Sequence, residues 1–492
     1  MYNKENYFMV NKLKKYIPLS VFKAFQPAYH FLVAWLAAYR YKFPSRRLII
    51  IGVTGTAGKT STAYLIMKML SEAGYKTGLS STAVFSDGDK EWLNDKKMTM
   101  PGRFFIQEML SRMLKNHCRY AVVETTSEGI KQFRHRFINY DILVFTNLYP
   151  EHLESHGSFE NYQAAKGALF AHLKRCKTKY IDEDKIVVEP KSEYRKLDLS
   201  RVQKTIIVNG DDKFASYFLN YYSEAKIVYT TKTEKDINSY LKLISTENIT
   251  KDFSLVKGTE ITPYEQGTSI KINGEVINLN LLGDYNALNA LAAYTVGLNQ
   301  KIDPLQLKQG LESVMGLAGK LEFIRVESES SGITQNFTAI VDYSFEPKAL
   351  TKLYETVKKL KHNRIIHVLG SAGGGRDKAR RPILGRMAAE NADIIIITNE
   401  DPYDEDPASI INEVAAGAEE LGRELNTDLF KIFDRQEAVK KALELAESGD
   451  LVLFTGKGAE QYICMANDVK IPWDEREVVR SEIRAKLSID SH

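Results

Sequence analysis

The residues best suited to phosphate chemistry stand together in the run Gly52–Thr60, whose sequence is GVTGTAGKT. Glycines let the backbone turn so that its N–H groups point at a phosphate, and the N-terminus of a following helix favours the anion. Lys59 would then reach the terminal phosphates of a nucleotide, and the Thr60 hydroxyl would bind Mg²⁺. The run departs from the strict phosphate-loop pattern, because Val53 stands five positions before Gly58. A purely structural glycine turn is the alternative interpretation.

Two polar residues near the ends of later apolar runs are candidate metal ligands. Glu124 directly follows the run Tyr120–Val123, and His152 lies shortly after the run Ile142–Phe145. In open α/β sheets ligands collect at the carboxyl ends of the strands, so both side chains are expected on the same sheet edge as Lys59. Oxygen ligands and an imidazole suit a metal that also binds phosphate. A helix-capping carboxylate is the alternative for Glu124.

Alternating strands and helices from residue 47 onward would position these side chains. Leu48–Val53 is predicted as a buried strand, and Thr60–Ala73 as a helix that ends at Gly74, where a left-handed residue is favoured. Repetition of strand, glycine turn and helix predicts an α/β fold with a parallel sheet covered by helices on both faces. The charged region from Lys174 to Arg201 is expected to hold loops or an excursion.

A second alternating series begins after Gly316 and predicts a second α/β domain with its own sheet. Its predicted strands are Ala339–Val341, Ile365–Leu369, Ile394–Ile397 and Leu451–Phe454. A chain of 492 residues is too long for one hydrophobic core. We therefore expect a helical N-terminal segment over residues 1–46, a central domain over 47–310 and a C-terminal domain over 311–492.

Composition indicates a cytoplasmic globular protein without a nucleic-acid partner. The chain has 67 Lys and Arg against 63 Asp and Glu, so its formal charge of +4 is no nucleic-acid signature. The three cysteines, Cys118, Cys176 and Cys464, lack CxxC spacing. They are interpreted as reduced thiols.

The N-terminal segment is apolar and aromatic with basic flanks. Its charge-free run, Ala24–Tyr39, is shorter than the roughly 20 residues that span a bilayer. No small-residue cleavage site follows it, which argues against a signal peptide. Two interpretations remain open: a helix packed on the body of the protein, or a helix that makes peripheral contact with a membrane surface.

The glycine loop resembles the GxTGTxGKT loop of the Mur ligases, and further motifs of that family recur in order. The matching segments in the first half are Thr99–Gly102, Glu124–Ser127, Phe145–Leu153, Asn161–Lys166 and Gly283–Ala293. Those in the second half are Gly319–Glu322, Val341–Tyr343, Gly373–Pro382, Thr398–Pro407, Gly456–Glu460 and Asp474–Glu477. The resemblance therefore covers the chain from the phosphate loop nearly to its end. Its most similar branch is that of the MurE-type enzymes, the UDP-N-acetylmuramoyl-tripeptide synthetases.

The resemblance implies a role for each matched position. ATP would be held by Gly55, Thr56, Gly58, Lys59, Thr60, Ser61, Asn286, Asn289, Lys320 and Asp342. Mg²⁺ would be held by Thr60, Glu124, His152 and Lys166, the last as a carbamate. The muramoyl peptide and the amino acid would be bound by Thr99, Thr126, Ser127, Arg376, Asp401, Pro402, Tyr403, Gly456 and Glu460. Without the motif, Lys166 would be interpreted as an ordinary surface lysine.

These roles imply an ATP-dependent acid–amino acid ligase of peptidoglycan biosynthesis, with a central phosphate-loop ATPase domain and a C-terminal Rossmann-like domain. The enzyme would join an amino acid to a UDP-N-acetylmuramoyl-peptide through an acyl phosphate, with Lys59, Glu124, His152 and Lys166 as its catalytic residues. Two alternatives are a folylpolyglutamate or cyanophycin-type ligase and a degenerate nucleotide-binding scaffold protein. Departures from the family motifs motivate the scaffold, among them Ala459, which replaces the GKGHE histidine.

Two further expectations concern substrate binding. Only about fifty residues precede the phosphate loop, so the N-terminal domain that grips the uridine nucleotide in MurE-type enzymes is expected to be missing. Tyr403 stands at the position of the arginine that pairs with the distal carboxylate of diaminopimelate in those enzymes. A phenol carries no positive charge at neutral pH, and acidic residues follow it. Lysine, ornithine or a small neutral amino acid is therefore the expected substrate.

Overall fold

The computed structural model describes residues 19–151, 156–181, 187–188, 200–233, 253–264, 267–326, 335–375 and 378–489. The predicted site residues His152 and Arg376 lie outside the described residues. The chain divides into two compact units. The first contains residues up to Glu91, Met98–Thr259 and Leu288–Gly310, and the second contains Trp92–Lys97, Glu260–Ala287 and the chain from Leu311 onward.

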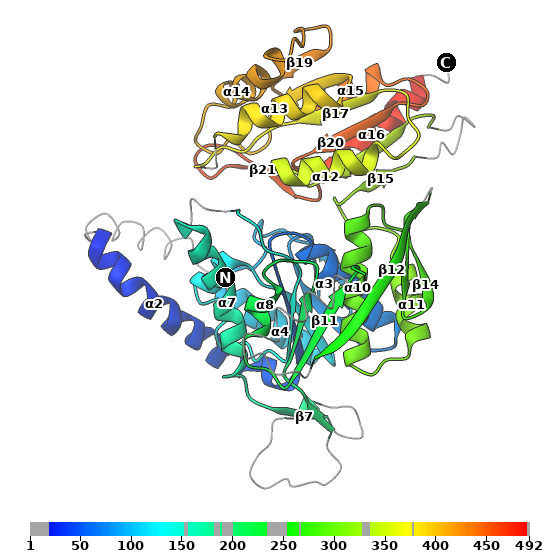
Figure 1. Cartoon of the computed structure of the whole chain (residues 1–492). Coiled ribbons are helices and arrows are strands. Elements are labelled where there is room, and N and C mark those ends of the chain that lie inside the picture. Colours follow the sequence, from blue (N-terminus) through cyan, green and yellow to red (C-terminus); the bar gives the residue numbers. More distant parts are fainter. Residues whose placement is uncertain are drawn as a thin grey trace. The chain divides into compact units, whose positions relative to one another are not determined.

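A largely parallel sheet forms the centre of the first unit (Figure 1). Its strands are β1 (Ile49–Thr54), β2 (Thr77–Ser80), β3 (Val84–Ser86), β4 (Glu91–Leu93), β5 (Tyr120–Glu124), β6 (Ile142–Phe145), β10 (Thr205–Asn209), β11 (Ala225–Thr230) and β12 (Ser254–Tyr264). The complete hydrogen-bonded order is β14-β13-β12-β11-β10-β6-β1-β5-β2-β3-β4, in which β13 (Gly267–Ile272) and β14 (Glu275–Leu279) belong to the second compact unit. Strand β1 is buried along its whole length and lies parallel to both β5 and β6. Its carboxyl end is therefore flanked by Glu124 on one side and Phe145 on the other.

Helices connect the strands of the first unit. They are α2 (Leu19–Arg40), the 3₁₀ helix η1 (Pro44–Arg47), α3 (Lys59–Glu72), α4 (Arg103–Lys115), α5 (Ser127–Lys131), α7 (Phe159–Leu173), α8 (Ala215–Leu219), α10 (Asp284–Asn299) and α11 (Pro304–Glu312). The last two begin or end in segments of the second unit. A small antiparallel sheet holds β7 (Lys179–Ile181), β8 (Val187–Val188) and β9 (Ser200–Val202). No helix of the described residues is both long and apolar enough to cross a membrane.

The second unit is built on a six-stranded sheet of order β15-β16-β20-β17-β18-β19, parallel except for β15 (Figure 1). Its strands are β15 (Glu322–Ile324), β16 (Thr338–Asp342), β17 (Ile365–Leu369), β18 (Ile394–Thr398), β19 (Leu429–Ile432) and β20 (Leu451–Thr455). Its helices are α12 (Pro347–Val357), α13 (Arg380–Asn391), α14 (Pro407–Glu419), α15 (Arg435–Leu445) and α16 (Glu475–Ile489). Two hairpins, β13 (Gly267–Ile272) with β14 (Glu275–Leu279) and β21 (Tyr462–Cys464) with β22 (Lys470–Pro472), complete it.

The hydrophobic core of the second unit has two layers, one on each face of its sheet, because side chains alternate between the faces along each strand. Ile365 and Leu369 of β17 pack with residues of α12, α13 and α14, whereas Ile366 and Val368 pack with residues of α15 and α16. Side chains of successive residues in a strand point to opposite faces, so one strand serves both layers. The predicted α/β class, with parallel sheets covered by helices, is confirmed.

Two glycines set the contact between α13 and α14. A Cβ atom on Gly385 would lie 1.9 Å from the Val414 carbonyl oxygen, and one on Gly417 would lie 1.9 Å from that of Pro382. Real Cβ atoms do not approach backbone so closely. Each helix therefore presents a glycine to the backbone of the other, and the two helices pack with no side chain between them at these points.

Candidate functional site

The phosphate loop joins β1 to α3 and has space only for glycine at two positions. A Cβ on Gly55 would lie 1.9 Å from Thr146 Oγ1, and one on Gly58 would lie 2.5 Å from Asn289 Oδ1. Gly58 also has a left-handed backbone, with φ of 78°, and directly precedes the first residue of α3, Lys59. Gly58 thus leads directly into the N-terminus of α3, where the sequence predicts that an anion binds.

The segment after β6 fixes the shape of this loop. The Thr56 N–H donates to the Asn147 carbonyl at 2.8 Å, and the Ala57 N–H donates to Asn147 Oδ1 at 2.8 Å. Thr146 Oγ1 and Asn147 Nδ2 both donate to the Ala57 carbonyl, at 2.7 and 3.1 Å. The Thr-Asn pair that the motif comparison selected therefore acts as a clamp on the loop.

Lys59, Thr60 and Glu124 meet at the carboxyl ends of β1 and β5. Lys59 Nζ donates to the Thr56 carbonyl at 2.7 Å, inside its own loop. Thr60 Oγ1 donates to Glu124 Oε1 at 3.1 Å. The other carboxylate oxygen of Glu124 accepts from the N–H and the hydroxyl of Thr82, at 2.8 and 2.9 Å. Sequence comparison did not select Thr82, because its contact with Glu124 depends on β2 lying beside β5.

Lys166 reaches the same place from α7. It is 1% exposed, and its Nζ donates to the Gly55 carbonyl at 2.7 Å and lies 4.7 Å from the centre of the Tyr162 ring. Burial first, and the charge of Lys59 second, lower the pKa of the Lys166 amine well below its usual value. Both effects favour the neutral form of the amine over the ammonium. The structure excludes the interpretation of Lys166 as an ordinary surface lysine.

Three hydroxyl residues predicted to bind the muramoyl peptide, Thr99, Thr126 and Ser127, form hydrogen bonds within the first unit. Thr82 Oγ1, which donates to Glu124, lies 2.8 Å from Thr99 Oγ1, so Thr99 is one side chain away from Glu124. Thr126 caps α5 by accepting from the Gly129 N–H at 3.1 Å. Ser127 Oγ lies 3.1 Å from His156 Nε2. The Thr126 hydroxyl is thus engaged in the fold itself.

Arg134 is a further residue of this region that sequence comparison missed. Its guanidinium donates to the Met100 carbonyl and to Gln132 Oε1, the latter at 2.6 Å. It therefore holds the segment that carries Thr99. It lies seven residues beyond Ser127, where the matched motif ends, so the motif itself did not point to it.

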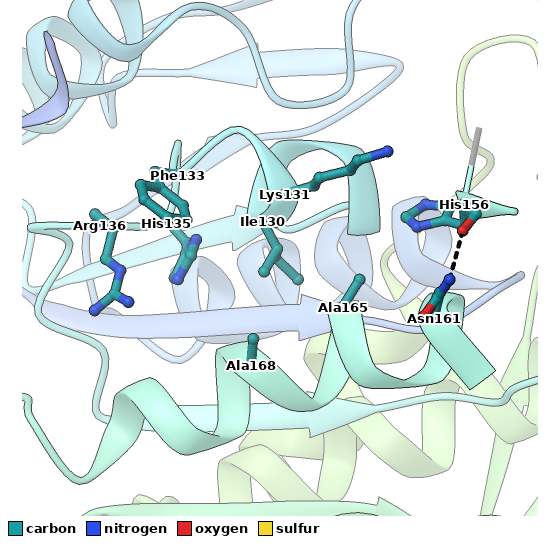
Figure 2. A pocket seen from close by; sticks show the side chains of 9 residues that line it. All are labelled: Ile130, Lys131, Phe133, His135, Arg136, His156, Asn161, Ala165 and Ala168. Atoms are coloured by element: carbon teal, nitrogen blue, oxygen red, sulfur yellow. Dashed lines mark hydrogen bonds between the residues drawn. The ribbon is translucent and has the colours of Figure 1, made fainter. Parts of the chain in front are cut away.

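A cavity of about 390 Å³ lies between α5 and α7 (Figure 2). Figure 2 shows Lys131, Phe133, His135 and Arg136 on one side of it, and His156 and Asn161 at one end. Asn161 Nδ2 donates to the His156 carbonyl at 3.0 Å. Its lining contains none of the phosphate-loop residues, so this cavity is separate from the site of the predicted chemistry.

Four residues outside the phosphate loop are predicted to bind the nucleotide. Asn289 contacts the phosphate-loop region, whereas Asn286, Lys320 and Asp342 belong to the second unit. Thr62 Oγ1 donates to Asn289 Oδ1 at 3.2 Å. Asn286 Nδ2 donates to the Leu282 carbonyl at 2.8 Å. Asp342 accepts from the N–H groups of Leu321 and Ser344, each at 2.7 Å, and Lys320 Nζ lies 4.7 Å from the Tyr343 ring centre.

The predicted amino-acid residues Asp401 and Glu460 lie together in the second unit, bridged by lysines. Lys457 Nζ donates to Asp401 Oδ1 at 3.0 Å and to Glu460 Oε2 at 2.7 Å. Lys97 Nζ donates to Asp401 Oδ1 at 2.9 Å and lies 3.1 Å from Glu460 Oε2. Burial alone would raise the pKa of Asp401, but Lys457 and Lys97 hold it below its usual value. Two carboxylates and two ammonium groups thus form a nearly neutral cluster.

Tyr403 is held beside this cluster by its backbone. Its φ is 52°, its N–H donates to the Cys464 carbonyl at 3.1 Å, and its ring lies over Gly374, where a Cβ would be 2.7 Å from Tyr403 Cδ2. The acidic residues after it have partners. Glu405 pairs with Arg381 at 3.0 Å, and Asp406 caps α14. The neighbourhood of Tyr403 is therefore less negative than the sequence suggests.

The described residues at the loop suit Mg²⁺ as it is usually bound. They contain no group of three or more His, Cys, Asp or Glu that could hold a metal, and His152 lies outside them. Mg²⁺ generally takes one or two carboxylates together with nucleotide phosphates and waters. The Thr60 hydroxyl and the Glu124 carboxylate, 3.1 Å apart at the phosphate loop, provide that kind of donor set.

Comparisons with known proteins agree with the motifs. Residues 53–198 match the Mur ligase middle domain, and residues 325–458 match the Mur ligase glutamate ligase domain. A UDP-N-acetylmuramyl-tripeptide synthetase of Roseiflexus sp. (strain RS-1) is 35% identical over 90% of this chain and 80% of its own length. A UDP-N-acetylmuramoyl-L-alanyl-D-glutamate--2,6-diaminopimelate ligase of Clostridium acetobutylicum is 30% identical over 92% of this chain and 81% of its own. A solved structure of an enzyme with the same activity name is 25% identical, with a TM-score of 0.54, over 89% of this chain and 79% of that one.

Proposed function

Since the chain belongs to the Mur ligase family and is an ATP-dependent ligase that forms amide bonds, we propose that it adds an amino acid to a UDP-N-acetylmuramoyl-dipeptide in peptidoglycan biosynthesis. The names of its relatives support this substrate. The observation that carries the proposal is the convergence of Lys59, Thr60, Glu124 and Lys166 on one loop.

The proposed reaction has two steps. A carboxylate oxygen of the peptide attacks the γ-phosphorus of ATP, the bond to the bridging oxygen breaks, and ADP leaves an acyl phosphate behind. The amine nitrogen of the amino acid then attacks the acyl carbon, inorganic phosphate leaves, and the nitrogen loses a proton as the amide forms. Negative charge moves across the phosphoryl oxygens in the first step, so fixed cations and N–H donors around them lower the barrier.

Lys59 and the loop backbone supply those groups in the proposal. Lys59 Nζ would exchange the Thr56 carbonyl for phosphate oxygens, while the N–H groups at the start of α3 donate to the same anion. Gly55 and Gly58 leave no side chain in the loop to compete for this space. The clamp from Thr146 and Asn147 keeps the donors in place before substrate arrives, so little reorganisation is required.

Mg²⁺ would be held by Thr60, Glu124, His152 and carbamylated Lys166. Bound there, the ion would neutralise charge on the nucleotide phosphates. Neutral Lys166 can react with carbon dioxide, and the product is a carboxylate in place of an amine. Its proximity to the loop, through the Gly55 carbonyl, is what such a ligand requires.

The other predicted contacts remain part of the proposal. We assign Asn286, Asn289, Lys320 and Asp342 to the nucleotide, and Thr99, Thr126 and Ser127 to the muramoyl peptide. The amino acid is assigned to Arg376, Asp401, Pro402, Tyr403, Gly456 and Glu460. ATP and the UDP-linked peptide are cytoplasmic molecules, so we place the enzyme in the cytoplasm. Contact with a membrane is a separate proposal, argued below.

Phosphate release tests the assignment of the loop. With UDP-N-acetylmuramoyl-dipeptide, ATP and a panel of amino acids, Lys59→Ala is expected to lower kcat by about 10²–10³-fold, the typical effect of one charge-stabilising group. Lys68→Ala is the matched control, because Lys68 lies on the same helix and pairs with Glu91 at the surface. Acceptor-dependent turnover in folded Lys59→Ala at the control rate would refute the assignment.

A further inference from the structure

Helix α2 has two apolar faces of different kinds. The inner face is made of small residues: Ala34, Ala37 and Ala38 are buried, at 2%, 0% and 0% exposure, where α2 packs along α4. His30 on the same side lies 2.6 Å from an Arg103 guanidinium nitrogen of α4. Alanine lets the two helices approach closely, so this face accounts for how α2 is attached to the first unit.

The outer face of α2 carries large hydrophobic side chains in contact with solvent. They are Phe25 (70% exposed), Tyr29 (56%), Phe31 (47%), Leu32 (53%), Trp35 (39%), Leu36 (42%) and Tyr39 (64%). Positions 25, 29, 32, 36 and 39 recur every three or four residues, which places them in one stripe along the helix. Trp35 and Tyr39 stack on each other, with ring centres 5.4 Å apart. A contiguous exposed patch of this kind marks a binding surface.

Positive charge adjoins this stripe. Arg40 follows Leu36 by one helical turn, and Lys42, Arg46 and Arg47 come directly after the helix, with Arg40, Lys42 and Arg47 exposed. No aspartate or glutamate occurs in the sequence between Glu5 and Glu72. A partner that supplies apolar depth and negative charge together would match this surface.

We propose that the outer face of α2 docks the enzyme on an anionic lipid bilayer. A second copy of this chain would bring the same basic residues and no carboxylate from its own α2, whereas acidic lipid head groups supply the missing charge beside acyl chains. Trp and Tyr side chains favour the boundary between head groups and acyl chains. With its alanine face against α4, α2 would lie in the plane of the membrane surface. The stripe from Phe25 to Tyr39 presents about 21 Å of contact along that surface.

Vesicle co-sedimentation of the full-length chain tests the docking surface. The apolar-face variant combines Leu32→Gln, Leu36→Gln and Tyr39→Gln, all at exposed helical positions. Its matched control combines Leu305→Gln with Met315→Gln, at positions outside α2 that are 61% and 78% exposed. With phosphatidylglycerol vesicles, wild type and control are expected to bind with a partition coefficient about tenfold or more above that of the apolar-face variant. Phosphatidylcholine vesicles and high salt should both weaken wild-type binding.

Quenching by brominated lipids tests the depth of insertion. Lipids brominated on the acyl chains should quench part of the tryptophan fluorescence of wild type, and Trp35→Phe should bind the vesicles but lose that quenching. Equal partition of wild type and the apolar-face variant, or no binding by either, would overturn the proposal. So would concentration-dependent self-association that the variant abolishes, since a second copy would then cover the face. Phosphate release by the apolar-face variant without vesicles measures ligase activity separately from membrane binding. The docking proposal and the proposed ligase function can therefore fail independently.

Discussion

Lys166 has the surroundings of a lysine that reacts as a free amine. It is buried beside Lys59, and its Nζ contacts the carbonyl of Gly55 in the phosphate loop. We expect Lys166→Ala to lose activity by about 10²-fold or more, and added formate or acetate to restore part of it by supplying the missing carboxylate. Lys174→Ala, at the exposed end of the same helix, should be unaffected.

The carbamate itself has a direct measurement. Wild type incubated with ¹³C-bicarbonate should show a carbamate carbon by NMR that Lys166→Ala lacks. A fully active Lys166→Ala, or identical spectra for the two proteins, would contradict the assignment.

Tyr403 determines the prediction for the amino acid. A phenol offers one hydrogen bond and no charge at neutral pH, so it pairs poorly with a distal carboxylate, which a guanidinium binds through two hydrogen bonds. We expect kcat/KM for lysine, ornithine or alanine to exceed that for meso-diaminopimelate. Tyr403→Arg should raise the value for diaminopimelate, whereas Tyr403→Phe should not. Because Glu405 and Asp406 already have partners, the prediction depends on Tyr403 and not on a general negative field.

A higher kcat/KM for diaminopimelate in wild type would show that another cation takes the place of the arginine. Lys97 and Lys457 are the described cations beside Asp401 and Glu460, so their alanine variants would be the next to measure.

At the residue scale, the sequence singled out residues that belong to local motifs, and the chemical roles of these residues remain predictions. Lys59, Thr60, Glu124 and Lys166 all come to one loop. Thr82 and Arg134 were not predicted, because their importance lies in contacts with residues far along the chain. A hydroxyl in a loop or an arginine after a helix carries no such information by itself.

At the element scale, the two glycines between α13 and α14 give a sharp prediction. A Cβ on Gly385 would press on the Val414 carbonyl, and helical backbone cannot move aside cheaply. We expect Gly385→Ala to lower the free energy of unfolding by about 1–3 kcal/mol, the usual cost of overpacking. Hydrogen exchange should show the loss of protection in α13 and α14.

Gly316→Ala is the control for this helix contact. Nothing lies within 4 Å of a Cβ placed there, and the backbone of Gly316 is not left-handed. Alanine should therefore leave stability unchanged or raise it slightly, by reducing the freedom of the unfolded chain. Similar protection in both variants would mean that the helices separate without cost.

Buried strands were the elements most accurately predicted. Ile142–Phe145 and Ile365–Leu369 coincide with β6 and β17, and the helix predicted at Thr60–Ala73 is α3 within one residue at either end. These runs are continuous and apolar because both faces of a parallel strand are buried. The sequence did not predict strand β12, because most of its residues are exposed or only partly buried and it contains no continuous apolar run. The same limit applies to α2, whose aromatic stripe could be assigned to core or membrane until its alanines were seen to be the packed face.

At the scale of the whole molecule, the chain does not complete one unit before it begins the other. It passes between them after Glu91, Lys97, Thr259, Ala287 and Gly310. The domain boundary at residue 310 that the sequence suggested remains a prediction. Compact packing groups Glu260–Ala287 with the later part of the chain. A cut at any single crossing would leave the units joined through the others.

This interleaving has a consequence for synthesis on the ribosome. Asn289, which lies against Gly58 and Thr62, arrives about 230 residues after the loop that it supports, as the numbering of Gly58 and Asn289 shows. A nascent chain that has emerged only as far as Thr259 still lacks the Leu288–Gly310 portion of the first unit. The phosphate loop therefore lacks its contact with Asn289 while Glu260–Ala287 of the second unit is being synthesised. The contacts of the phosphate loop with Asn289 are thus completed late in synthesis, about 230 residues after the loop itself is translated.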